Sequence, residues 1–155
     1  MKFGLMLMLL LASQLSFAQS IKSKKIKEEM LTRVDTLISK IDESRAHLAK
    51  EEVAQACDKI DEIFKILPDH LIGIGTKMNL FDPAVIRMEN ESKIFLIWIH
   101  QRHNICNNGI RGEELDMGET SKELKSMKKK FEKQKKRIKK SDTDFENTYN
   151  YYYEF

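Results

Sequence analysis

Apolar residues recur at spacings of three and four along most of this chain, which is the pattern of helices that bury one face. Residues 21–47, 50–78 and 120–140 show this pattern. Residues 84–108 contain no glycine or proline, which allows one more helix of about 25 residues. The pattern predicts an all-α protein, an antiparallel bundle of about four helices.

The apolar positions predict which face of each helix is buried. In the first helix they are Ile26, Met30, Val34, Leu37, Ile38 and Ile41. In the second they alternate spacings of four and three: Val53, Cys57, Ile60, Phe64 and Leu67. The last helix carries a narrow stripe, with Gln134 in its gap: Leu124, Met127, Phe131 and Ile138. So narrow a stripe predicts a helix on the outside of the bundle.

The two prolines mark features of the helices. Pro68 lies inside the second helix, and because proline lacks an N–H and clashes with the preceding turn, it predicts a kink there. Asp82 and Pro83 predict the start of the third helix, with Asp82 as the N-cap and Pro83 in the first helical position.

Residues 94–99, IFLIWI, are all apolar. Six consecutive apolar residues go right round a helix, so we expect this segment to be buried on most sides. The same run also suits a buried strand. The uninterrupted length of residues 84–108 favours the helix.

The N-terminus has the pattern of a secretory signal peptide. Lys2 precedes an apolar run, and small residues follow at Ser16 and Ala18, so we expect residues 1–18 to be removed by cleavage after Ala18. The apolar run is too short to span a membrane, and no later segment is long enough. These features predict a periplasmic or secreted protein, with residues 19–140 as a single helical domain.

The two cysteines are predicted to form a disulfide, because exported proteins meet an oxidising environment. Cys57 lies 21 residues before Met78, and Cys106 lies 23 residues after Pro83. If the second and third helices form an antiparallel hairpin, these similar lengths bring Cys57 and Cys106 to the same end.

His100, His103 and Cys106 follow one another at intervals of three. They suggest a metal or haem site as an alternative, but the three side chains spread over 120° of a helix and a disulfide-bonded Cys106 is no thiolate ligand. We therefore expect no cofactor, and keep His100 and His103 as the alternative metal-binding pair.

Positive charge is concentrated in residues 121–140, which hold eleven basic and two acidic residues. This block predicts a binding surface for a protein or for an anionic envelope surface, whereas export argues against nucleic acid. The alternative is a solvated face, partly neutralised by acidic neighbours. The predicted partner-binding residues are Lys128, Lys129, Lys130, Lys133, Lys135, Lys136 and Arg137.

Residues 141–155 form a tail of different composition. Aromatic residues alternate at its end, at Tyr149, Tyr151, Tyr153 and Phe155. We interpret the tail as a second partner-binding segment. The alternative is an end whose rings dock on the bundle.

The chain lacks the motifs GxSxG and HExxH and a phosphate-binding P-loop, so we expect no catalytic residues and no enzyme activity. The leading hypothesis is an exported binding or adaptor protein. A small metal- or haem-binding bundle and a self-associating structural protein are the alternatives.

Overall fold

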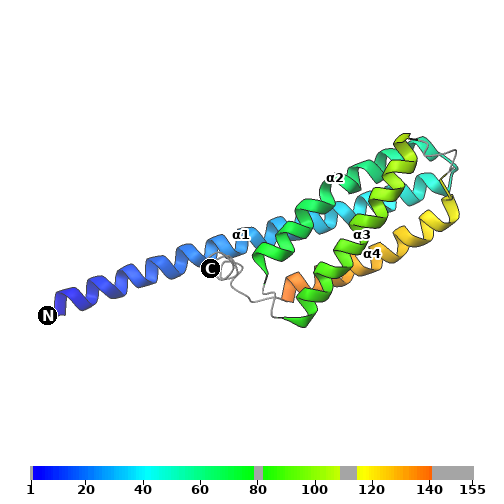
Figure 1. Ribbon diagram of the computed structural model, residues 1–155. Coiled ribbons are helices and arrows are strands. Elements are labelled where there is room, and N and C mark those ends of the chain that lie inside the picture. The colour runs from blue at the N-terminus through cyan, green and yellow to red at the C-terminus, as the bar shows by residue number, and fades with distance from the viewer. Residues whose placement is uncertain (1, 79–81, 109–114, 141–155) are drawn as a thin grey trace.

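The computed structural model describes residues 2–78, 82–108 and 115–140, and side chains from residue 24 onward within these ranges, except that of Asn108. Four helices account for nearly all of them: α1 (Lys2–Leu48), α2 (Val53–Lys77), α3 (Pro83–Asn108) and α4 (Met117–Lys140) (Figure 1). No strand occurs in these ranges. The prediction of an all-α bundle of four helices is confirmed.

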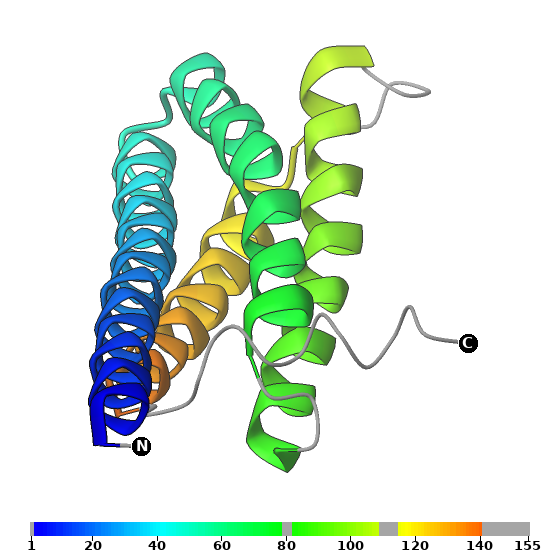
Figure 2. The ribbon, with the colours of Figure 1, turned by 90° about the vertical axis from the view of Figure 1, so that its left-hand side faces the viewer.

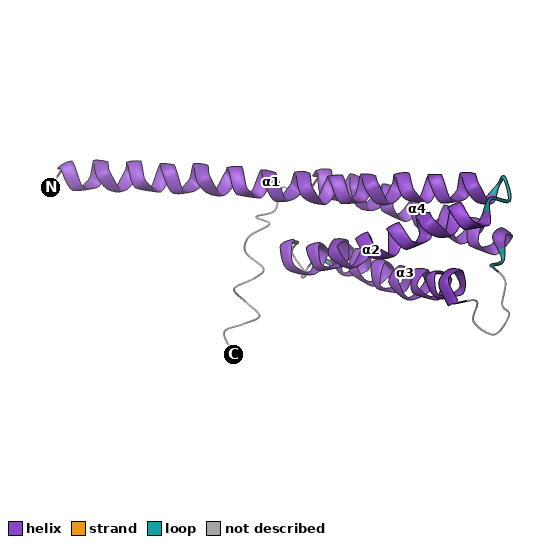
Figure 3. Cartoon of the chain, turned by 90° about the horizontal axis from the view of Figure 1, so that it is seen from above, coloured by secondary structure: helices purple, strands orange, loops and turns teal. Residues whose placement is uncertain are grey.

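The helices alternate in direction along the bundle, and α1 and α2 form its most extensive contact. α1 packs against α2 and α4, α2 packs against α3, and α3 touches α4 more lightly. Figure 3 shows α1 and α4 on one side of the bundle and α2 and α3 on the other. Figure 2 shows α4, yellow to orange, slanting beside α1. This arrangement leaves one side of α4 facing outward along its whole length.

α1 is longer than the predicted first helix, because it begins at Lys2 and not near residue 21. Its first half extends beyond the other helices (Figure 1). The earliest residue of the described core is Met30. Removal of residues 1–18 would therefore take away none of the described core.

Charged side chains join α1 to α2 across the bundle. Lys40 of α1 binds Glu62 of α2 at 2.8 Å, and Lys59 of α2 binds Glu43 of α1 at 3.3 Å. The hydrogen bonds from Lys40 to Glu62 and Glu43 raise the pKa of Lys40 to about 12. Lysines that face a neighbouring helix here are thus matched with carboxylates.

The buried face of α4 matches the predicted stripe, Gln134 included. Its buried residues alternate spacings of four and three: Thr120, Leu124, Met127, Phe131, Gln134 and Ile138. Gln134 is accommodated by polar partners from two other helices. His70 Nε2 of α2 lies 2.9 Å from Gln134 Oε1, and Gln134 Nε2 donates to Ser92 Oγ of α3 at 3.3 Å.

The predicted seam of α2 is partly wrong. Ile60 and Leu67 are buried as expected, but Val53 is 38% exposed and Cys57 and Phe64 are half-buried. The fully covered positions are Ala56, Ile60, Ile63, Leu67, His70, Gly73 and Ile74. The reason is that α2 packs against α1 on one side and α3 on the other, so its apolar arc is wider than one seam.

The expectation that residues 94–99 are buried on most sides is also wrong. Phe95 and Ile99 are buried, whereas Ile94 and Ile97 are 61% and 63% exposed. α3 packs on α2 and only lightly on α4, so its opposite side has no neighbour among the described residues.

The two prolines lie where the sequence placed them. α3 begins at Pro83, and the backbone N–H of Ala84 donates to Asp82 Oδ1 at 2.8 Å, which confirms the predicted N-cap. α2 runs through Pro68 as one helix. A kink at Pro68 stays a prediction.

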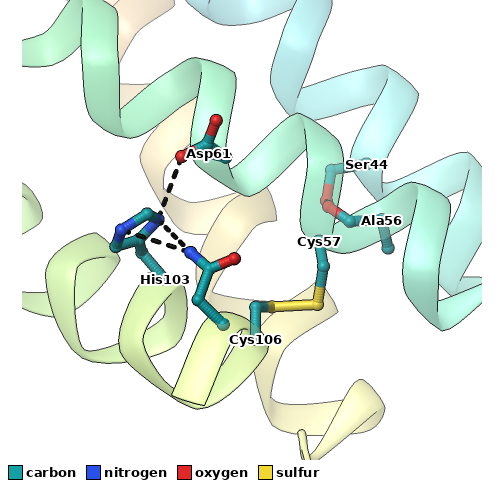
Figure 4. The surroundings of a disulfide bond; sticks show 7 residues. Ser44, Ala56, Cys57, Asp61, His103 and Cys106 are labelled. Atoms are coloured by element: carbon teal, nitrogen blue, oxygen red, sulfur yellow. Dashed lines mark hydrogen bonds and ion pairs between the residues drawn. A yellow bond between two sulfur atoms is a disulfide. The ribbon is translucent and has the colours of Figure 1, made fainter.

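The predicted disulfide is confirmed: Cys57 of α2 is bonded to Cys106 of α3, with a Cα–Cα distance of 5.6 Å (Figure 4). It joins the start of α2 to the end of α3, across 49 residues of sequence. The bond therefore fixes one end of the α2–α3 hairpin.

Candidate functional site

The buried residues of α4 divide the helix into an inner face, two edges and an outer face. Because they follow a heptad spacing, the positions beside them also repeat every seven residues. Lys128 and Lys135 lie on the edge toward α1, and Lys130 and Arg137 lie on the edge toward α3.

The edge toward α1 is held by two ion pairs one heptad apart. Lys128 Nζ lies 2.5 Å from Asp42 Oδ2, and Lys135 pairs with Asp35. The acidic partners are themselves seven residues apart on α1. Each of these two lysines of α4 therefore lies opposite one aspartate of α1, with the two helices antiparallel.

The edge toward α3 is held in the same way. Lys130 Nζ lies 3.8 Å from Glu91 Oε1, and Arg137 pairs with Asp82. The backbone N–H of Ala84 and the Arg137 guanidinium hold the pKa of Asp82 below its usual value. Lys130 also lies over the Phe95 ring, 5.1 Å from its centre. Both edges of α4 are thus braced, which fixes the rotation of the helix about its own axis.

The outer face of α4 carries most of the remaining charge. We define it as nine exposed positions, seven of them lysine: Lys122, Lys125, Ser126, Lys129, Glu132, Lys133, Lys136, Lys139 and Lys140. Its net charge is +6. From Lys122 to Lys140 it extends over about 27 Å. Within the described part of the chain, none of these lysines takes part in an ion pair.

The seven basic residues predicted to bind a partner are divided between these surfaces. Lys129, Lys133 and Lys136 lie on the outer face, whereas Lys128, Lys130, Lys135 and Arg137 take part in the ion pairs of the edges. The sequence prediction missed the other outer lysines: Lys122, Lys125, Lys139 and Lys140. The heptad spacing of the buried residues could have separated the two groups. Tyr149, Tyr151, Tyr153 and Phe155 lie outside the described residues.

The outer face has no apolar side chain. Apart from the lysines it contains only Ser126 and Glu132. Such a surface attracts negative charge but offers no hydrophobic group for burial against a partner.

The two histidines of the alternative metal site make other contacts. His103 stacks on Phe64 with ring centres 4.6 Å apart. The Nδ1 atom of His103 lies 3.2 Å from Asp61 Oδ1 (Figure 4). His100 stacks on the same ring at 5.3 Å. Cys106 is in the disulfide. Among the residues with described side chains, no three of the types His, Cys, Asp and Glu are placed to hold a metal ion.

A cavity of about 250 Å³ lies between α1 and α2. Its lining mixes apolar side chains such as Ile26 and Ile72 with charged ones of both signs, including Glu29 and Arg33. Arg33 Nη1 lies 3.5 Å from the carbonyl oxygen of Asp69. This mixture favours no single class of ligand.

No protein-family model matches the chain, and no curated protein or solved structure matches it either. Over the residues that the structure describes, no helix combines the length and apolar character needed to cross a membrane. A proposal about function must therefore rest on the residues of the chain itself. The outer face of α4 is the most distinctive surface among the described residues.

Proposed function

We propose that the protein is an exported, non-enzymatic binding or adaptor protein that attaches to negatively charged partners through the outer face of α4. The observation that carries this proposal is the division of the basic residues of α4. The cations on its edges pair with acids of α1, with Glu91 of α3 and with Asp82 just before α3. Among the described residues, the seven lysines on its outer face have no acidic partner.

This division has an energetic consequence. Like charges three or four residues apart on a helix destabilise it by a few tenths of a kcal/mol per pair. The outer face contains several such pairs, among them Lys125–Lys129 and Lys129–Lys133. A charge of +6 on one side of a helix thus opposes folding, and a negatively charged partner would remove that repulsion.

Two features support export. Residues 1–18 have the pattern of a signal peptide. Disulfides are typical of oxidising compartments outside the cytosol, and Cys57 and Cys106 form one. A periplasmic or secreted location is therefore part of the proposal.

Binding to poly-glutamate, a soluble acidic polymer, tests the role of the outer face. The test variant is Lys125→Gln/Lys129→Gln/Lys133→Gln/Lys136→Gln. The control variant removes four exposed lysines elsewhere and has the same net charge as the test variant. Its substitutions are Lys24→Gln/Lys25→Gln/Lys50→Gln/Lys93→Gln. Glutamine preserves helix propensity, so both variants should fold.

We expect the test variant to bind roughly tenfold more weakly or worse, at about 0.5 kcal/mol for each lost ion pair. The control variant should bind nearly as well as the natural chain. Binding should also weaken steeply with salt. An equal loss in both variants would mean that net charge alone causes binding, and binding unaffected by high salt would contradict an electrostatic site.

A further inference from the structure

We infer that the partner of the outer face of α4 is the surface of an anionic phospholipid bilayer. This inference rests on the proposed function, because it concerns the same face. Three properties of the face favour lipid headgroups over an acidic protein.

The first property is the absence of anchoring groups. Specific protein interfaces bury a few aromatic, apolar or arginine side chains, which supply most of the affinity. The outer face of α4 has none of these among its nine positions. A bilayer surface requires no such anchors, because its charge is spread over many headgroups.

The second property is the choice of lysine. The only arginine of α4, Arg137, lies on the edge and pairs with Asp82. Arginine binds one fixed carboxylate or phosphate through two parallel hydrogen bonds, whereas lysine is a hydrated point charge on a flexible stem. Lysines therefore suit many mobile anionic headgroups better than a single fixed acceptor.

The third property is the shape of the face. Lys122, Lys129 and Lys136 form a central row with a spacing of seven. Lys125 and Lys139 lie along one flank, and Lys133 and Lys140 lie along the other. A plane laid along the central row brings the flexible lysines of all three rows within reach, over about 27 Å.

The braced edges keep this face turned outward. Rotation of α4 that carried the central row away from a surface would break the ion pairs to Asp35 and Asp42 on one edge or to Asp82 and Glu91 on the other. The lysines are thus presented together before any contact. Because no apolar side chain lies among them, attachment is peripheral and reversible, and salt releases it.

Vesicle co-sedimentation tests this inference. The probes are vesicles of an equimolar mixture of phosphatidylcholine and phosphatidylglycerol, vesicles of phosphatidylcholine alone, and poly-glutamate in parallel. The proteins are the natural chain, the two glutamine variants, and Lys125→Arg/Lys129→Arg/Lys133→Arg/Lys136→Arg, which keeps the charge. Circular dichroism confirms that each variant is folded.

Of the two kinds of vesicle, we expect the natural chain to bind only those with phosphatidylglycerol, and it should also bind poly-glutamate. The outer-face glutamine variant should bind them on the order of a hundredfold more weakly, since each lysine near an anionic surface contributes to partition. The control variant and the arginine variant should bind like the natural chain.

Other results separate the two proposals. Binding to poly-glutamate without binding to phosphatidylglycerol vesicles would overturn the bilayer inference and leave the proposed function in place, with an acidic protein as the partner. Binding to neither would overturn both. Equal binding to neutral vesicles, or an equal loss in the glutamine variant and its control, would also overturn the bilayer inference.

Discussion

The buried pair His70–Gln134 shows how single residues fix the way α4 sits on the bundle. Gln134 Nε2 donates to Ser92 Oγ and to the carbonyl oxygen of Met88, at 3.3 and 3.4 Å. Its Oε1 is therefore the acceptor for the N–H of His70 Nε2, at 2.9 Å. The pair links α2, α3 and α4 through one side chain.

Replacement of Gln134 by leucine should destabilise the protein by about 1–3 kcal/mol, because it leaves the buried N–H of His70 without an acceptor. The double variant His70→Leu/Gln134→Leu leaves neither group unpaired and should recover part of the loss. Urea unfolding of the single and double variants measures this. A Gln134→Leu variant as stable as the natural chain would show that the pair contributes nothing.

Burial also lowers the pKa of His70 below its usual value, although the hydrogen bond to Gln134 opposes the shift. The unfolded chain therefore binds a proton at a pH where the folded chain does not. It follows that the stability from neutral His70 is present above the ordinary histidine pKa, about 6.5, and decreases as the pH falls below it.

Thermal unfolding at pH 7.5 and at pH 5 should show this loss, and the His70→Leu/Gln134→Leu variant should lose less over the same range. The comparison separates the contribution of His70 from the contributions of all other ionisable groups. If both proteins lose the same stability, His70 is not the group responsible.

At the scale of elements, α3 differs most from its sequence pattern. The run of residues 94–99 contains enough apolar side chains to face neighbours all round, but among the described helices α3 packs closely on α2 and only lightly on α4. Hydrophobic periodicity measures how apolar a segment is, and it carries no information about how many helices surround it. For the same reason, the periodicity predicted that Val53 is buried in the seam of α2, whereas its side chain is 38% exposed.

The exposure within this run predicts unequal effects of substitution. Ile99→Ala should destabilise the protein by about 2–5 kcal/mol, because the side chain is fully buried and its loss leaves a cavity. Ile94→Ala and Ile97→Ala should each cost less than about 0.5 kcal/mol, as is usual for exposed positions. Urea unfolding of the three variants provides the test. Losses of several kcal/mol at Ile94 or Ile97 would show that the outward side of α3 is covered in solution.

α4 is the element that the sequence predicted best. Its buried stripe has an unbroken heptad spacing and few alternatives, because nearly every other position is charged. The acids that neutralise its edges could not be found in this way. These acids are distant from α4 in the sequence: Asp35, Asp42, Asp82 and Glu91. The sequence alone draws attention to the acidic residues that directly precede and follow the basic block, some of which lie beyond Lys140, outside the described part.

At the scale of the whole molecule, the disulfide was predictable from helix geometry. Two segments of similar length on either side of a short connection bring Cys57 and Cys106 to one end, as the structure shows. Closure of a loop across 49 residues stabilises a fold by about 4 kcal/mol in the chain-entropy model. The binding surface of α4 could not be predicted in the same way. The basic block of residues 121–140 contains both lysines that pair with acids of α1 and α3 and lysines that are exposed, and its composition does not separate the two groups.

The proposals on export and the disulfide make a joint prediction about the mature molecule. If the signal peptide is cleaved after Ala18, the natively exported protein begins at Gln19, and the described core, which begins at Met30, is intact. Its mass under denaturing, non-reducing conditions should equal that of residues 19–155 less two hydrogens, and reduction should add them back. A protein that keeps residues 1–18 would contradict cleavage.

Free thiols in the exported chain would show that Cys57 and Cys106 do not pair in the cell. A native mass that includes a bound metal or haem would support the alternative site at His100 and His103.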